Sequence, residues 1–278
     1  MKKVKFSSKK LVISGNVFEL YLYDEPRRID PLPQSTNTPP APTKPKEKKE
    51  EREKSSVYRS KKNLIRLINS NVRFHFNNQT GKPHKPLFVT FTFAKNMQDM
   101  KLANYKFTKF IQRFNYEVFK VKEARLAYVV AIEFQKRGAI HYHAIFFNLQ
   151  FIENLKAVLS EVWTEGFTDY QIVKNNITDV GHYITKYMNK ENSDPRLVGK
   201  KCYFSSKSLF KPAIIKDPQK IEAIMNFIPK EDMGYERYVE ASEYGCGYNY
   251  QVYNVSDRGF IKGSLDLFVK PGYLDEKL

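Results

Sequence analysis

The spacing of apolar and polar residues changes along the middle of the chain, and these changes predict a series of strands and helices. Residues 87–93 alternate threonine with apolar residues, as a half-buried strand does, whereas residues 98–120 repeat apolar residues at helical spacing. Two more strands are expected at 126–135 and 139–148, then a helix over 151–163 and a strand over 167–174. The predicted order is β-α-β-β-α-β.

This order is that of a split βαβ unit, and it predicts an α+β fold with a ferredoxin-like, or RRM-like, core. Such a core is a central antiparallel sheet with helices on one face. The other face of the sheet is then available for a ligand.

Residues 30–56 separate an N-terminal segment from this core. They are rich in proline and then in Lys and Glu, with almost no apolar content, so we expect a disordered linker. The helix predicted at 57–69 is amphipathic and basic, and its charged face either contacts DNA or is merely solvated. We divide the chain into an N-terminal strand segment that pairs with the main body (1–29), the linker (30–56), the core (57–200) and a β-rich extension packed on the core (201–278).

Two histidines stand two residues apart in the apolar run 139–147, so His141 and His143 share one face of the predicted strand. A hairpin loop of residues 136–138, with glycine supplying a positive φ, would place Glu133 directly opposite His141. A carboxylate and two imidazoles on one face predict a metal site. The set suits Mg²⁺ or Mn²⁺ that must also bind a phosphate, although imidazoles alone also suit zinc.

Two tyrosines follow in a stretch that is predicted to be helical. Tyr183 and Tyr187 are four residues apart, so both phenols project from one helical face with Lys186 alongside. A phenol with a pKa of about 10 is a weak nucleophile until a neighbouring cation stabilises the phenolate. A metal site with paired tyrosines and a cation is suited to attack on a phosphodiester.

Composition agrees with a nucleic-acid partner. The chain holds 47 Lys and Arg against 30 Asp and Glu, a net charge of +17, which attracts polyanions, although a lysine-rich proteome would produce the same excess. Cys202 and Cys246 have no metal-binding or disulfide spacing. No apolar run is long enough for a signal peptide or a membrane span, so we expect a cytoplasmic protein.

Taken together, these sequence motifs resemble those of the HUH endonucleases, in particular the two-tyrosine replication initiators of rolling-circle plasmids and single-stranded DNA phages. The resemblance covers roughly residues 57–255. Its motifs are the threonine strand 88–93, the metal motif 138–143 and the nucleophile motif 183–187, with further likeness at 133–138 and 163–167.

The resemblance implies a metal-dependent, site-specific single-stranded DNA endonuclease that leaves a 5′-phosphotyrosine and a free 3′-hydroxyl and later rejoins strands. Tyr183 stands where single-tyrosine relatives carry the attacking phenol, so we expect it to make the first cut; Tyr187 makes the second or only packs. Our candidates for DNA contacts are Thr90, Thr92, Arg137 and Lys190. The expected partners in a bacterial host are single-stranded or hairpin origin DNA, a polymerase and a helicase. The helicase is expected because the chain lacks a GxxxxGK[ST] string, the motif of an ATP-driven motor.

Two alternatives remain open. A relaxase or an HUH transposase would use the same chemistry on another element. A non-catalytic ferredoxin-like module would instead stack bases on Phe88, Phe91 and Phe93, although it would need no histidine pair in mid-strand. The tyrosine-rich segment 245–253 either stacks on unpaired bases or packs in a core.

Overall fold

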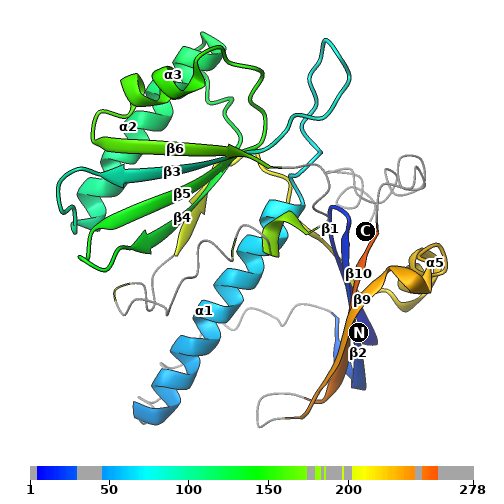
Figure 1. Ribbon diagram of the computed structural model, residues 1–278. Coiled ribbons are helices and arrows are strands. Elements are labelled where there is room, and N and C mark those ends of the chain that lie inside the picture. Colours follow the sequence, from blue (N-terminus) through cyan, green and yellow to red (C-terminus); the bar gives the residue numbers. More distant parts are fainter. Residues whose placement is uncertain are drawn as a thin grey trace. The chain divides into compact units, whose positions relative to one another are not determined.

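The computed structural model describes residues 5–29, 46–173, 179–182, 185, 196, 202–241 and 246–255, with the side chains of the first helix described from Tyr58 onward. The chain divides into two compact units, Met1–Lys49 with Lys211–Leu278, and Glu50–Phe210. Each unit contains a five-stranded antiparallel sheet together with helices (Figure 1). The α+β class predicted from the sequence is therefore confirmed.

The sheet of the unit Glu50–Phe210 has the element order predicted from the hydrophobic pattern. Its strands are β3 (Leu87–Phe93), β4 (Tyr128–Phe134), β5 (Ile140–Phe146), β6 (Gly166–Ile172) and β7 (Tyr203–Ser205), arranged β6-β3-β5-β4-β7. All neighbouring strands are antiparallel. Helix α2 (Met100–Phe119) follows β3 and helix α3 (Leu155–Val162) follows β5, which completes the β-α-β-β-α-β succession.

Helices α2 and α3 lie on one face of this sheet, where the larger hydrophobic core forms (Figure 1). The alternation in β3 sends Val89, Phe91 and Phe93 into this core, while Thr90 and Thr92 point to the other face and are half-buried. Helix α2 buries residues at helical spacing, namely Ala103, Phe107, Phe110 and Phe114. Each ring removed from water contributes roughly 1.5–3 kcal/mol. Phe91 and Phe93 are thus core residues, which excludes them as base-stacking platforms.

The opposite face of the sheet is partly covered by helix α1 (Lys46–Asn69). Residues Leu64, Ile68 and Val72 pack on this face against Val129, Ile145 and Phe147, and Val180 joins the same cluster. On this face, one row of paired residues lies nearest the loop of the β4–β5 hairpin and outside the cluster. It consists of Glu133, His141, Thr92 and Phe167.

Helix α1 begins earlier than the sequence suggested. We expected residues 30–56 to be a disordered linker, but the structure is helical from Lys46, and residues 30–45 lie outside the described part of the chain. Low apolar content indicates only that a segment buries little surface. Lys, Glu and Arg are good helix formers, and extending a helix whose C-terminal half is already anchored costs little.

The other unit joins the two ends of the chain in one sheet. Its elements are β1 (Phe6–Ser14), β2 (Val17–Arg28), β8 (Ala213–Ile215), α5 (Pro218–Met225), the 3₁₀ helix η2 (Lys230–Asp232), β9 (Met233–Val239) and β10 (Tyr248–Asn254). The strand order is β8-β1-β2-β10-β9. Ile221 and Ile224 of α5 pack against Leu11, Ile13 and Phe18 of the hairpin β1–β2.

This arrangement differs from the division that we expected. We expected segment 1–29 to pair with the main body and 201–278 to pack on the core, whereas residues 17–23 of β2 pair with β10. Among the described strands of the C-terminal segment, only β7 joins the core sheet, where it pairs with β4, so this unit ends at Phe210 rather than at residue 200. Pairing between strands so distant in sequence leaves no local pattern from which it could be predicted.

The tyrosine-rich segment 245–253 contributes its rings to this second sheet. Tyr250 packs on Tyr21 with ring centroids 5.0 Å apart, and Tyr248 packs on Tyr23 at 5.7 Å. The hydroxyl of Tyr250 donates to the buried carboxylate of Glu19 at 2.6 Å. These contacts agree with the packing alternative for this segment.

Cys202 and Cys246 are both free thiols, as their spacing predicted. Among the described residues, none of the helices combines the length and the apolar character needed to cross a membrane.

Candidate active site

The β4–β5 hairpin has the geometry expected from its sequence. Gly138 adopts a φ of +82°, in the left-handed region that glycine tolerates best. Its N–H donates to the carbonyl of Gln135 at 2.7 Å, and the N–H of Gln135 donates to the carbonyl of Ala139 at 2.8 Å. The resulting register pairs Glu133 with His141, as predicted.

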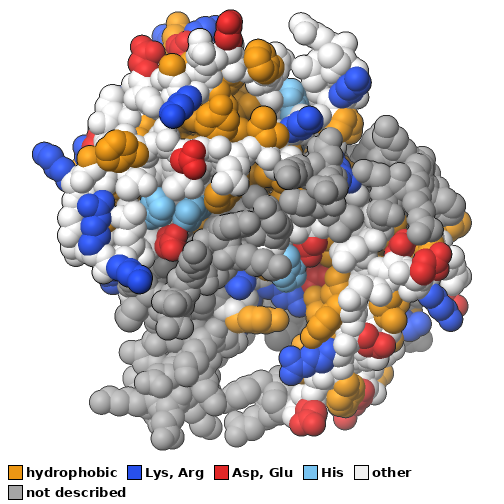
Figure 2. Space-filling view, in the orientation of Figure 1, with side chains coloured by type: hydrophobic (Ala, Val, Ile, Leu, Met, Phe, Trp, Pro, Cys, Tyr) orange, Lys and Arg blue, Asp and Glu red, His pale blue; other side chains and the backbone are white. Residues whose placement is uncertain are grey.

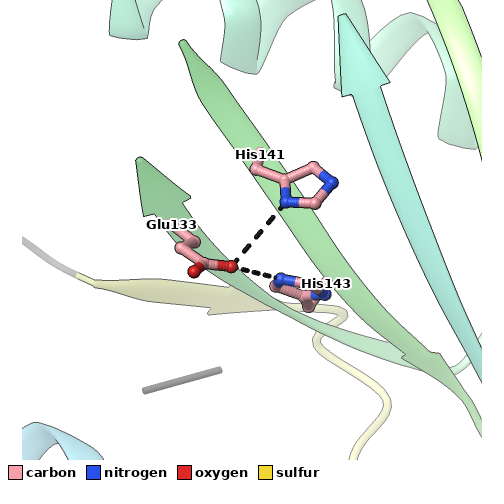
Figure 3. A group of neighbouring side chains, drawn as sticks. All are labelled: Glu133, His141 and His143. Carbon is pink, nitrogen blue, oxygen red and sulfur yellow. Dashed lines mark hydrogen bonds and ion pairs between the residues drawn. The ribbon is translucent and has the colours of Figure 1, made fainter. Parts of the chain in front are cut away.

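The hairpin brings three potential metal ligands together. His143 Nε2 lies 2.5 Å from Glu133 Oε2, and His141 Nδ1 lies 3.7 Å from the same oxygen (Figure 3). One donor atom from each of the three side chains lies within 4.8 Å of the others. The space-filling view shows a pair of histidine side chains beside an acidic one at the surface over β4 and β5 (Figure 2). The site is therefore within reach of a ligand.

These distances fit a divalent cation. Ligand atoms about 2.1 Å from a metal lie about 3 Å from one another, and the observed separations of 2.5 and 3.7 Å lie on either side of that value.

The charge of Glu133 also suits a cation. Burial by itself raises the pKa of Glu133, but hydrogen bonds and positive charge from His141 and His143 outweigh it and lower the pKa to about 2. The carboxylate is therefore ionised at neutral pH and offers an anionic oxygen to a metal.

Two threonines of β3 contact the ring nitrogens that face away from Glu133. Thr92 Oγ1 lies 2.8 Å from His141 Nε2, and Thr90 Oγ1 lies 3.3 Å from His143 Nδ1. These contacts follow from the β3–β5 register, in which each threonine is paired with one histidine. A hydroxyl that accepts the outer N–H leaves the inner nitrogen lone pair directed at the metal position. The sequence suggested DNA contacts for Thr90 and Thr92 but gave no sign of this arrangement.

Replacing Thr92 with valine should weaken Mn²⁺ binding by roughly tenfold to a hundredfold, because His141 would lose the partner that fixes its orientation and tautomer. Valine keeps the shape and strand preference of threonine, so the thermal unfolding temperature should change little. Isothermal titration with Mn²⁺ measures the effect. Thr108→Val, which removes an exposed hydroxyl on α2, is the matched control; equal Mn²⁺ affinity in both variants would show that Thr92 does not position His141.

Other side chains border the triad. The ring of Phe88 stacks on His143 with an interplanar angle of 7° and centroids 5.6 Å apart. Arg137, an expected DNA contact, donates from Nη2 to the carbonyl of Phe93 at 2.8 Å and from Nε to Gln135. The guanidinium is therefore fixed beside the end of β3, one residue beyond Thr92.

Tyr183, Lys186 and Tyr187 lie outside the described residues, as does Lys190, the fourth DNA-contact candidate. Their shared helical face and their roles stay predictions.

The residues just before and between the predicted nucleophiles are described in part, and their contacts hold them firmly. Residues 180–182 and 185 are helical, and Asp179 Oδ1 accepts the N–H of His182 at 2.8 Å, as a helix N-cap does. Asn69 of α1 donates to Asp179 at 2.9 Å and accepts the N–H of Gly181 at 2.7 Å. A Cβ on Gly181 would lie 2.5 Å from the carbonyl oxygen of Ile65, so only glycine fits here. Nothing in the sequence indicated this role of Asn69.

Comparison with known proteins agrees with this site. Residues 86–192 match a family model of the replication-associated protein ORF2. This stretch runs from β3 through β6 and the tyrosine segment, and it includes all three members of the triad. Neither the curated proteins nor the solved structures gave a match. The site-bearing part of the chain is thus similar to replication-associated proteins.

Proposed function

We propose that this protein is a rolling-circle replication initiator of the HUH endonuclease type, which nicks single-stranded origin DNA by tyrosine attack and later rejoins strands. The convergence of Glu133, His141 and His143 carries the proposal. The proposal is further supported because this triad lies in a segment that matches the model of the replication-associated protein ORF2 family. Tyr183 and Tyr187 follow in the same segment.

The fold supports the same proposal. In the sheet, β5 lies between β3 and β4, and β6 lies beside β3. Together with α2 and α3 on one face, this strand order supports a ferredoxin-like split βαβ core. The opposite face holds the triad, and a DNA strand would lie there.

In the proposed reaction, the phenol oxygen of Tyr183 attacks the scissile phosphorus and forms a P–O bond to the tyrosine. The bond between phosphorus and the 3′ oxygen breaks, the phenol proton passes to solvent, and the 3′ oxygen takes up a proton from solvent to become a hydroxyl. A Mg²⁺ or Mn²⁺ ion held by Glu133, His141 and His143 would withdraw charge from the phosphate. Lys186 would stabilise the phenolate.

The products explain why such chemistry serves replication. The free 3′-hydroxyl is a primer for a polymerase, and the phosphotyrosine bond preserves the energy of the phosphodiester, so rejoining needs no ATP. A second nucleophile, Tyr187, would let cleavage and rejoining alternate in successive rounds. A relaxase or transposase would share these steps, but the similarity to a replication-associated family favours the initiator.

The proposed function predicts a strong preference for unpaired DNA. Full-length protein with Mn²⁺ should cut and become covalently linked to a single-stranded oligonucleotide from the adjoining origin, because in-line attack needs a backbone distortion that pairing resists. Relaxed duplex of the same sequence should resist. Denaturing gels detect both the cut and the protein–DNA adduct.

Binding to the single strand should weaken by orders of magnitude between low and high salt, since a chain of net charge +17 displaces counterions from the phosphates. Equal cutting of relaxed duplex and single strand would contradict the proposed function.

A further inference from the structure

An exposed aromatic ring adjoins the triad on the same face of the sheet. Phe167 of β6 is paired with Thr92, which is paired with His141, which in turn is paired with Glu133. Side chains of directly paired residues in antiparallel strands project from the same face. Phe167 therefore lies in one row with the triad, two strands or about 10 Å from His141.

The backbone beneath Phe167 is fixed, yet its ring faces solvent. A Cβ on the preceding Gly166 would lie 2.2 Å from the carbonyl oxygen of Thr92, so glycine lets β6 lie close to β3 at this point. The carbonyl of Glu165 accepts the N–H of Ala94 at 2.9 Å, and the Glu165 carboxylate binds Lys106 of α2 at 2.7 Å. Despite this anchoring, Phe167 is 73% exposed. A large apolar ring is therefore open to a ligand in the row that holds the triad.

Charge around the ring identifies the class of ligand. Arg137 is bound to the carbonyl of Phe93, whose strand partner is Gly166, so a guanidinium lies at the same end of the sheet as Phe167. Asp169, the next residue of β6 on this face, is exposed and would repel a phosphate. A polyanion with an apolar, stackable group satisfies both features, provided that its phosphates lie on the side of Arg137.

We infer that Phe167 is a stacking platform for an unpaired nucleobase of the DNA strand whose phosphate lies at the triad. The inference rests on the proposed function, and it adds that the protein holds a base next to the scissile position through an aromatic face rather than through hydrogen bonds to base edges. Stacking of this kind tolerates any base, so Phe167 contributes affinity and position rather than sequence specificity.

The test measures binding of the full-length protein to two labelled probes in EDTA, so that no cleavage occurs. One probe is a dT homopolymer and the other is an abasic strand of the same length. Phe167→Ala should weaken binding of the dT probe about tenfold, within a range of roughly five- to a hundredfold, and leave binding of the abasic probe unchanged. Phe151→Ala is the matched control, because Phe151 is 94% exposed in the loop between β5 and α3.

Phe167→Trp provides a second measurement. Trp163 is the only tryptophan of the chain and is 1% exposed, so a new indole at position 167 would be the exposed one. Its fluorescence should be quenched by the dT probe and not by the abasic probe. Unchanged dT binding by Phe167→Ala, or an equal loss on both probes, would overturn the inference. If the stacking role fails but the wild type still binds and cuts origin DNA, the proposed function stands. A wild type that binds neither probe and cuts nothing refutes both the stacking role and the proposed function.

Discussion

Removal of divalent cations with EDTA is expected to abolish cleavage of single-stranded origin DNA, and added Mn²⁺ or Mg²⁺ to restore it. The His141→Ala variant should cut about a thousandfold more slowly or worse even at saturating metal, because charge stabilisation by a bound cation contributes several kcal/mol and each 1.36 kcal/mol is a factor of ten. Rates of oligonucleotide cleavage under single-turnover conditions measure both effects.

Controls separate metal binding from folding. His141 is half-buried and lies outside the two core clusters of its unit, so the alanine variant should keep the circular dichroism spectrum of the wild type. His84→Ala removes a half-buried histidine in the segment before β3 and should cut normally. Glu133→Gln keeps the shape of the side chain and removes its charge, and should weaken Mn²⁺ binding. Cleavage that persists in EDTA would refute the metal-dependent mechanism.

Replacing Tyr183 with phenylalanine is expected to abolish the covalent protein–DNA adduct, because the variant lacks the oxygen that must bond to phosphorus. Tyr187→Phe should still cut and form the adduct but fail to transfer or rejoin strands. Mass spectrometry of the trapped, protease-digested adduct identifies the modified residue. Both assignments come from the sequence alone, so this experiment tests the part of the site that the structure does not describe.

An exposed tyrosine outside the proposed site provides the matched control. Tyr105→Phe on α2 loses a hydroxyl at a position that is 59% exposed, and should form the adduct at the wild-type rate. A DNA-linked peptide modified solely at Tyr187 would reverse the order of the two tyrosines. An adduct at neither residue would remove tyrosine chemistry from the protein.

The metal triad could be predicted because it depends on short-range geometry. The two-residue spacing of His141 and His143 fixes a shared face once the segment is a strand. Gly138 then fixes the length of the hairpin loop, and the loop fixes the register that brings Glu133 opposite His141. The alternation in β3 was equally informative, since it separated the buried phenylalanines from the threonines.

Features that join distant parts of the sequence could not be predicted in this way. The contacts of Thr90 and Thr92 with the histidines depend on which strand lies beside β5, and many topologies share the same local patterns. Asn69 holds the start of the tyrosine segment across more than a hundred residues of sequence. Phe167 looked like an ordinary apolar strand residue until the register placed it on the site face, where it is exposed.

The chain order of the two units determines when each can form during synthesis. The unit Glu50–Phe210 is continuous in sequence, whereas β1 and β2 are made before it and must wait for β8 and β10, which are made after it. An isolated two-stranded hairpin is marginally stable in water, so β1–β2 has no finished sheet to join while the ribosome translates the intervening residues. Because domains fold as units as they emerge, the triad-bearing unit should form before the sheet that contains β1, β2 and β10 is complete.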